Sequence, residues 1–272
     1  TEGEWAASDI KTVTNEDLRR LGRKGIDLIC AGFPCQAFSI AGKRRGFEDT
    51  RGTLFFEIAR AAKQIKPRYL LLENVKGLLS HDKGKTFATI LTTLDELGYD
   101  AEWQVLNSKD FGVPQNRERV FIIGHLRGER TRKVFPIEGK NGKPYGNTVN
   151  CLDANYYKGL DSHQARTGVL EVRPILTPNR EKKRQNGRRI KEHNEPMFTL
   201  TAQDRHGVYD GYRIRKLTPR ECWRLQGFPD WAFEKAQAAG VSDTQLYKQA
   251  GNSVTVNVVY EIARRLNDYM KD

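Results

Sequence analysis

Two side chains in the N-terminal half combine a possible nucleophile with a possible acid. Cys35 lies in residues 32–39 (GFPCQAFS), where glycine and proline fix the backbone directly after a short apolar run. Glu73 directly follows a second apolar run. A lone cysteine is usually a small buried hydrophobe, and a glutamate in this place can also cap a turn. Where both groups meet at one sheet edge, they favour nucleophilic catalysis assisted by an acid.

A third polar element, residues 115–119 (QNRER), stands just before the apolar run of residues 120–124. In an extended segment, alternate side chains point to the same side, so Arg117 and Arg119 are candidates to bind an anion or a carbonyl group in the same cleft. The alternative is that both arginines lie on a solvated basic edge of the sheet. This alternative is stronger for Arg117 than for Arg119.

The apolar spacing around these residues predicts the elements that position them. It predicts helices over residues 54–65 and 86–97 and strands over residues 26–31, 69–72, 102–106 and 120–124. The order strand, helix, strand gives a β-α-β unit with buried parallel strands, and its repetition predicts a doubly wound α/β sheet. Such sheets bind ligands just beyond the carboxyl ends of their strands, where Cys35 and Glu73 both lie.

The same periodicity divides the chain into three parts. Residues 1–125 form the predicted α/β domain. In residues 126–212 the periodicity fades and Gly, Asn, Pro and basic residues accumulate, which predicts a small, mostly irregular or β domain; a solvated insertion or a disordered linker is the alternative. Residues 213–272 become regular again, with a helix capped by Thr218 and an amphipathic helix over residues 254–269 that returns to the first domain.

Charge and cysteine usage limit the function classes. The 272 residues carry 46 Lys and Arg against 34 Asp and Glu, a formal charge of +12, which favours a polyanion such as nucleic acid; an ordinary basic protein is the alternative. There is neither an apolar run of about 18 residues nor a leader-like start, so we expect no membrane and a cytoplasmic location. Cys30 and Cys35 lack partners at zinc-binding spacing, so no metal site is expected.

Further motifs accompany these residues in a fixed order along the chain. They are residues 51–56 (RGTLFF), 73–75 (ENV), 215–221 (RKLTPRE), 226–229 (QGFP) and 249–254 (QAGNSV). Together with the Pro-Cys segment and the QNRER element, they resemble the bacterial C5-cytosine DNA methyltransferases of restriction-modification systems. The resemblance implies a Rossmann-like methyltransferase sheet, with a target-recognition domain inserted before the C-terminal helices. It also implies double-stranded DNA as the partner and association with the bacterial nucleoid.

The resemblance implies a mechanism that suits the residue types. The Cys35 thiolate would add at C6 of cytosine and make C5 nucleophilic toward the methyl group of S-adenosylmethionine. Glu73 would hydrogen-bond N3 and the exocyclic amine, and Arg119 would hold O2. Arg117 and Gln115, from the same motif, would support this site. Because a stacked base is inaccessible, the cytosine would be flipped out of the duplex.

Binding residues carry over from the resemblance by position. The expected cofactor contacts are Asp9, Ile10, Pro34, Leu54, Asn252, Ser253 and Val254. An aspartate can accept a bond from the adenine amine, but Asp9 is equally suited to a turn. The expected DNA contacts are Gln36, Ser39, Lys43, Arg44 and Arg45 in a closing loop and Thr199 and Leu200 in the recognition domain.

One feature of the family pattern is not found. The family begins with Phe-x-Gly-x-Gly and an acidic residue that binds the ribose, whereas residues 1–10 read TEGEWAASDI. We therefore expect that a missing N-terminal segment or a companion chain supplies this motif, and that the 272 residues alone bind S-adenosylmethionine weakly or not at all. Two alternatives stay open: a tRNA cytosine-5 methyltransferase, and an inactive or split DNA-binding fragment or subunit.

Overall fold

The computed structural model describes residues 6–34, 54–139, 173–178, 188–192, 195–202, 205–209 and 214–270, except for the side chains of residues 268–270. The chain forms two compact units. Unit 1 comprises residues 1–106, 118–137 and 265–272, and unit 2 comprises residues 107–117 and 138–264. Each unit is described by itself.

These units do not coincide with the domain boundaries expected after residues 125 and 212. Residues 107–117 group with unit 2, and only residues 265–272 of the C-terminal segment group with unit 1. The reading of residues 126–212 as a target-recognition domain stays a prediction. No helix in the described ranges is both long enough and apolar enough to cross a bilayer.

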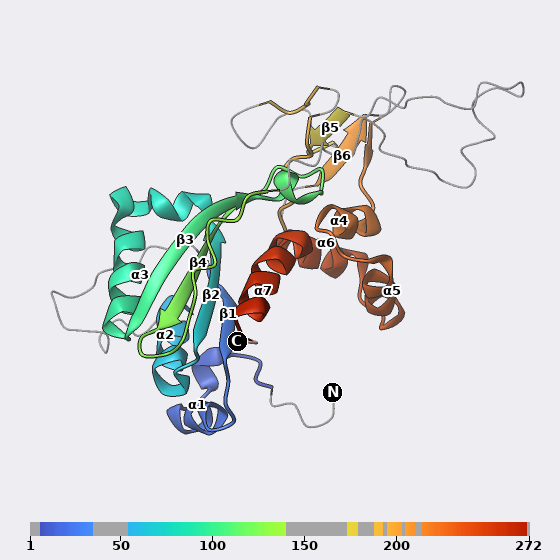
Figure 1. The fold of residues 1–272 in the computed structure, drawn as a ribbon. Helices are drawn as coiled ribbons and strands as arrows, with labels where there is room; N and C mark the ends of the chain where they lie inside the picture. Colours follow the sequence, from blue (N-terminus) through green and yellow to red (C-terminus); the bar gives the residue numbers. More distant parts are fainter. Residues whose placement is uncertain are drawn as a thin grey trace, which may run out of the picture. The chain divides into compact units, whose positions relative to one another are not determined.

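Unit 1 is built around a four-stranded sheet in the order β1-β2-β4-β3 (Figure 1). Its strands are β1 (Leu28–Gly32), β2 (Tyr69–Val75), β3 (Tyr99–Asn107) and β4 (Glu118–Leu126). β1 and β2 are parallel, as the sequence predicts, but β4 runs antiparallel to β2, which was not predicted. Only residues 108–117 connect β3 with β4, and this is too short for the crossover that a parallel return requires.

The described part of unit 1 contains the helices α1 (Asn15–Gly22), α2 (Leu54–Ile65) and α3 (Lys85–Glu96), and the end of the closing helix. α2 has the predicted bounds, and α3 differs from its prediction by one residue at each end. α1 begins with a capping box, in which the Thr14 side chain accepts from the Asp17 amide and the Asp17 carboxylate accepts from the Thr14 amide. Within the described ranges, 3-10 turns occur at Ile10–Thr12, Lys76–Leu79, His81–Gly84 and Ser108–Phe111.

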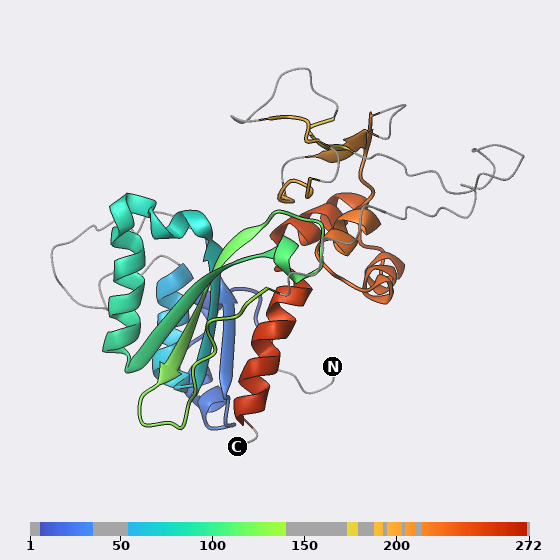
Figure 2. The ribbon, with the colours of Figure 1, turned by 45° about the horizontal axis from the view of Figure 1, so that its top comes forward.

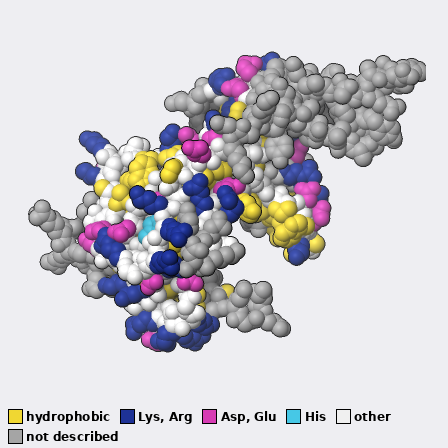
Figure 3. Space-filling view, viewed as in Figure 1, with side chains coloured by type: hydrophobic (Ala, Val, Ile, Leu, Met, Phe, Trp, Pro, Cys, Tyr) yellow, Lys and Arg dark blue, Asp and Glu magenta, His cyan; other side chains and the backbone are white. Residues whose placement is uncertain are grey.

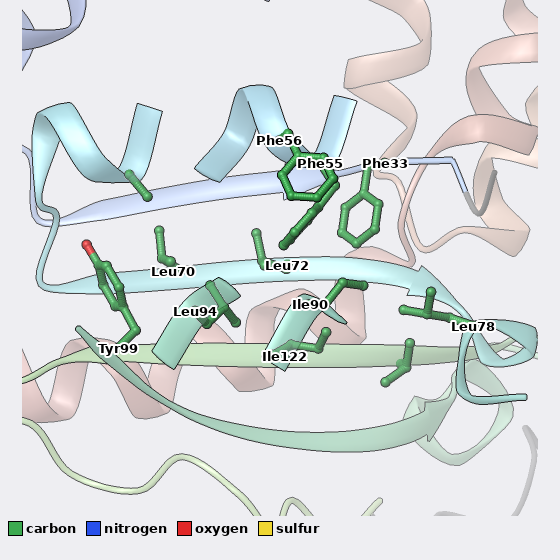
Figure 4. Packing of buried hydrophobic residues seen from close by; sticks show 12 residues of the cluster. Phe33, Phe55, Phe56, Leu70, Leu72, Leu78, Ile90, Leu94, Tyr99 and Ile122 are labelled. Atoms are coloured by element: carbon green, nitrogen blue, oxygen red, sulfur yellow. The ribbon is translucent and has the colours of Figure 1, made fainter. Parts of the chain in front are cut away.

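Both faces of the strand β2 are buried, which explains why it reads as a continuous apolar run. Leu70 and Leu72 of β2 pack with Ile122 of β4 against aromatic side chains of α2 and against α3 (Figure 4). The alternate residues Tyr69 and Leu71 point to the opposite face of the sheet and are also buried. Figure 2 shows the sheet and its helices from a second direction. A strand buried on both faces loses the alternating pattern of a half-exposed strand.

Side chains of β3 hold an irregular segment of unit 1 in place. Glu102 accepts from the backbone amides of Val134 (2.6 Å) and Phe135 (3.2 Å). Gln104 exchanges two bonds with Ile137, at 2.9 and 2.7 Å. The segment after β4 is therefore attached to the sheet by side chains rather than by a strand ladder.

The surface of unit 1 carries many basic side chains. Figure 3 shows Lys and Arg gathered at the end where α1 lies, and α1 with its flank contains Arg19, Arg20, Arg23 and Lys24. Glu16 lies near two of them, at 3.6 Å from Arg19 and 3.5 Å from Arg23. The positive charge of the chain is therefore not confined to the segment expected to bind DNA.

Unit 2 combines a small sheet with a helical cluster. Its antiparallel strands are β5 (Arg173–Leu176), β6 (His206–Tyr209) and β7 (Ile214–Lys216), and its helices are α4 (Pro219–Leu225), α5 (Asp230–Ala238), α6 (Asp243–Asn252) and the larger part of α7 (Val256–Met270). Thr218 caps α4 in a capping box with Glu221 and Pro219 is its first residue, so the predicted start is confirmed. The closing helix begins at Val256, two residues after the predicted start.

Candidate active site

Glu73 and Arg119 form an ion pair in unit 1. Glu73 lies near the carboxyl end of β2, and Arg119 is the second residue of β4, paired in register with Val75. Since side chains two residues apart point to the same face of a sheet, the two groups meet: Glu73 Oε1 lies 2.9 Å from Arg119 Nε. The side chains are 18% and 16% exposed. They are thus shielded from water but not sealed off from it.

The pair depends on its small neighbour Gly32, which is aligned with Glu73 at the end of β1. A Cβ atom at position 32 would lie 3.3 Å from Glu73 Oε2, closer than ordinary van der Waals contact. Glycine therefore leaves room for the carboxylate. It also means that Oε2 lies on the β1 side, while Oε1 lies on the Arg119 side.

Burial and charge act in opposite directions on Arg119. Burial lowers the pKa of its guanidinium below the ordinary value, whereas the Glu73 carboxylate acts to raise that pKa. A second bond runs from Nη1 to the Glu118 carbonyl at 2.8 Å. The carboxylate thus offsets part of the cost of shielding the cation, and the pair presents an acceptor beside a donor.

Asn74, for which the sequence predicts no role, joins the ends of β1 and β2. The side chain is buried; its Nδ2 donates to the Phe33 carbonyl at 2.8 Å, and its Oδ1 accepts from the Val75 amide at 2.8 Å. Phe33 stands two residues before Cys35 in the sequence. A polar residue inside the apolar end of a strand was the signal that could have identified this contact.

Several predicted residues lie outside the described ranges. They are Cys35, Gln36, Ser39, Lys43, Arg44 and Arg45. Pro34, the last described residue before them, is exposed. The roles of these residues stay predictions.

The remaining cofactor candidates of unit 1 lie in two places. Asp9 caps a 3-10 turn, and its Oδ1 accepts from the Lys11 amide at 2.9 Å. The Ile10 carbonyl accepts from Arg60 Nη2 at 3.0 Å. Leu54 opens α2 with 38% of its surface exposed. The turn role expected as the alternative for Asp9 is thus present, but a carboxylate has further lone pairs for an adenine amine, and the assignment stays a prediction.

Gln115 and Arg117 belong to unit 2, and both are buried. Gln115 Nε2 donates to the Leu225 carbonyl at 2.8 Å. Arg117 donates to three main-chain carbonyls, those of Leu200, Gly251 and Ser253. Arg117 and Arg119 were expected to point to the same side, but their partners differ. Arg119 binds a carboxylate, and Arg117 binds backbone carbonyls. Both side chains are thus hydrogen-bonded to the backbone of unit 2, and their part in catalysis stays a prediction.

The predicted binding residues of unit 2 lie in two segments. Asn252 ends α6, Ser253 caps it by donating its hydroxyl to the Ala250 carbonyl at 2.9 Å, and Val254 lies between α6 and α7. Thr199 donates its hydroxyl to the Asn116 carbonyl, and Leu200 is buried. Within unit 2 these segments are positioned by hydrogen bonds that involve the backbone.

Comparison with known proteins decides the family. The model of C-5 cytosine-specific DNA methylases matches residues 2–268, nearly the whole chain. The chain belongs to this family. The orphan methyltransferase M.SPRI of Bacillus phage SPR is 35% identical over 92% of this chain and 85% of its own length. The type II methyltransferase M.SsoII of Shigella sonnei is 42% identical over 92% of this chain and 67% of its own.

Solved structures support the methylase fold. The Dnmt2 methyltransferase of S. pombe matches with a TM-score of 0.60 and 18% identity, covering 98% of this chain and 85% of that one. A putative DNA modification methyltransferase from an E. coli prophage matches with a TM-score of 0.60 and 20% identity, covering 97% and 86%. These identities show the fold alone. The Rossmann-like methyltransferase sheet and the enzyme class, a DNA cytosine-C5 methyltransferase, are therefore as the motifs predicted.

Gln226 of the QGFP motif is another buried residue for which the sequence predicted no role. Gln226 is fully buried; its Nε2 donates to the Ala250 carbonyl at 2.8 Å, and its Oε1 accepts from the Thr255 hydroxyl at 3.0 Å. The Thr255 hydroxyl also lies 2.7 Å from that of Ser108. The QGFP and QAGNSV motifs are thus connected by a buried polar network, which no local sequence pattern reveals.

Proposed function

We propose that this methylase transfers a methyl group from S-adenosylmethionine to C5 of a cytosine flipped out of a specific duplex sequence, as part of a restriction-modification system. The observation that carries the proposal is the Glu73–Arg119 pair at the end of the parallel strands β1 and β2, with the Pro-Cys segment continuing from β1. The relatives named as type II methyltransferases favour the restriction-modification setting.

In this proposal each side chain has one task toward the base. The Cys35 thiolate forms a bond to C6, and the C5–C6 electron pair makes C5 nucleophilic. Glu73 enters this step protonated on Oε2, on the β1 side; the proton passes to N3 as the sulfur adds, and the resulting carboxylate accepts from the exocyclic amine, while Oε1 stays with Arg119. The guanidinium of Arg119 faces O2, so the charge that develops on the ring is stabilised from both sides. Loss of the C5 proton and breakage of the C6–sulfur bond release Cys35.

Candidate residues for the methyl donor occur in each unit, which is considered by itself. S-adenosylmethionine supplies an electrophilic methyl group when it is bound. The half-exposed Leu54 and the carboxylate of Asp9 suit an adenine, since one offers an apolar contact and the other an acceptor for the amine. Asn252, Ser253 and Val254 are the candidates in unit 2. The expectation of weak binding by these 272 residues stays a prediction, and isothermal titration with S-adenosylmethionine tests it.

Bisulfite sequencing of DNA from cells that express the protein tests the proposed activity. We expect new 5-methylcytosine within one short sequence, and none with the Cys35→Ala variant. A purified protein should form a Cys35-dependent covalent adduct with a duplex that carries 5-fluorocytosine in that sequence. Absence of both methylation and adduct would overturn the proposal, and methylation of tRNA but not of duplex DNA would replace its substrate.

A further inference from the structure

The Leu200 peptide is held from both ends by two side chains of one motif. Its amide donates to Gln115 Oε1 at 3.0 Å, and its carbonyl accepts from Arg117 Nη1 at 2.8 Å. The backbones also pair, because the Asn116 amide donates to the Met197 carbonyl at 3.0 Å. The segment around Leu200, which is expected to contact DNA, is therefore fixed to residues 115–117.

The other arm of the same guanidinium reaches the end of α6. Arg117 Nη2 donates to the carbonyls of Ser253 at 2.7 Å and Gly251 at 3.1 Å. Arg117 is only 3% exposed. Because a guanidinium is planar and rigid, a displacement at Leu200 is transmitted to the carbonyls at the other arm. Arg117 thus links the segment expected to contact DNA to the segment expected to bind the cofactor.

A close backbone contact reinforces this link. A Cβ atom on Gly251 would lie 2.5 Å from both the Ala202 amide nitrogen and the Thr201 carbonyl carbon. Real Cβ atoms essentially never come so close to other backbone atoms, so the two segments touch with no space between them. Residues 200–202 cannot shift toward α6 without moving it.

We propose that Arg117 couples DNA binding at Thr199 and Leu200 to cofactor binding at residues 252–254. The inference rests on the proposed function, which assigns these two ligands. Arg117 contacts neither ligand and is a positioning residue. A ligand that orders one segment also orders Arg117 and the other segment, so the second ligand binds with a smaller loss of conformational entropy. Such coupling is reciprocal: each ligand raises the affinity of the other by the same factor.

The coupling is measured with a duplex that carries the sequence methylated in cells and with S-adenosylhomocysteine, titrated to concentrations that allow for the weak cofactor binding expected of these 272 residues. For the wild-type protein we expect each ligand to tighten the binding of the other about 10-fold, within the usual range of allosteric coupling. In Arg117→Lys, each ligand still binds alone, but the factor falls toward 1, since an ammonium group cannot hold carbonyls on both segments in a fixed fork. The matched control is Arg23→Lys in unit 1, at an exposed site, and it should keep the wild-type factor.

Hydrogen exchange of the wild-type protein provides a test that needs no variant. We expect the duplex alone to slow exchange of the amides of residues 251–256, and S-adenosylhomocysteine alone to slow exchange of residues 199–202. If each ligand protects only its own segment, or if Arg117→Lys keeps the coupling factor, the inference is wrong while the proposed function stands. If the wild-type protein binds neither ligand, the proposed function fails and the inference fails with it.

Discussion

Arg117 and Arg119 stand two residues apart in one motif, yet their surroundings differ. Arg119 is partly exposed and binds the Glu73 carboxylate in unit 1, whereas Arg117 is buried and binds three neutral carbonyls in unit 2. A carboxylate can accept a hydrogen bond from a substrate ring and exchange a proton with it, whereas a backbone carbonyl can accept a hydrogen bond but not exchange a proton. The same side chain at two positions of one motif is therefore expected to serve chemistry at position 119 and architecture at position 117.

The largest expected effect is on the rate of methyl transfer, through Glu73, the partner of Arg119. Glu73→Gln should lower kcat by about 10²- to 10⁴-fold, the range for loss of a general acid or base, because the amide that replaces the carboxylate cannot transfer a proton to N3. Transfer of a labelled methyl group to the duplex measures it. Glu118→Gln is the matched control, since the Glu118 side chain pairs with Lys76 at the surface, at 2.9 Å, and the substitution leaves its backbone carbonyl in place. Equal losses in both variants would contradict the assignment.

For the free energy of unfolding, we expect Arg117 to matter more than Arg119. Arg117→Ala removes the donor from three carbonyls in a buried site and should lower the free energy of unfolding by about 3 kcal/mol. Arg119→Ala breaks one ion pair that is shielded but not sealed off from water, and should lower the free energy of unfolding by about 1.5 kcal/mol. Urea unfolding of both variants gives the two values. If Arg119→Ala destabilises the protein as much as Arg117→Ala, the division of roles between the two arginines is wrong.

Local patterns predict the elements of this fold better than the partners of its polar residues. The apolar spacing of α2 and the β2 run depends on neighbours along the chain, so α2 is predicted to the residue and Glu73 is placed at the correct strand end. The partners of Arg117 come from residues 83 to 136 positions away. The direction of β4 likewise depends on the short connection before it. Long-range geometry of this kind leaves no trace in local periodicity.

A substitution at Gly251 tests the packing beside Arg117 and should have a smaller effect on stability than Arg117→Ala. Gly251→Ala forces a methyl group into the backbone of residues 201 and 202 and should destabilise the protein by about 2 kcal/mol, as overpacking does. Gly77→Ala is the control, because its Cβ would lie 3.9 Å from the Val75 side chain, an ordinary van der Waals contact. Thermal unfolding compares the two. Equal stability of the variants would show that the contact at Gly251 yields easily.

The smallest expected effect concerns pH, which acts on carboxylates such as Glu102 but not on the carbonyl contacts of Arg117. Burial by itself raises the pKa of Glu102, but hydrogen bonds from His125 and from the amides of Val134 and Phe135 outweigh it, so the pKa lies below the ordinary value of 4.5. A carboxylate with a lowered pKa contributes its full stabilisation above the unfolded-state pKa and loses it as the pH falls through the folded-state pKa. The difference in free energy of unfolding between wild type and Glu102→Gln should therefore be constant above about pH 5 and shrink below it. A difference that grows on acidification would show that Glu102 is held in its protonated form, and that this part of unit 1, like the Arg117 site, does not depend on a charged carboxylate.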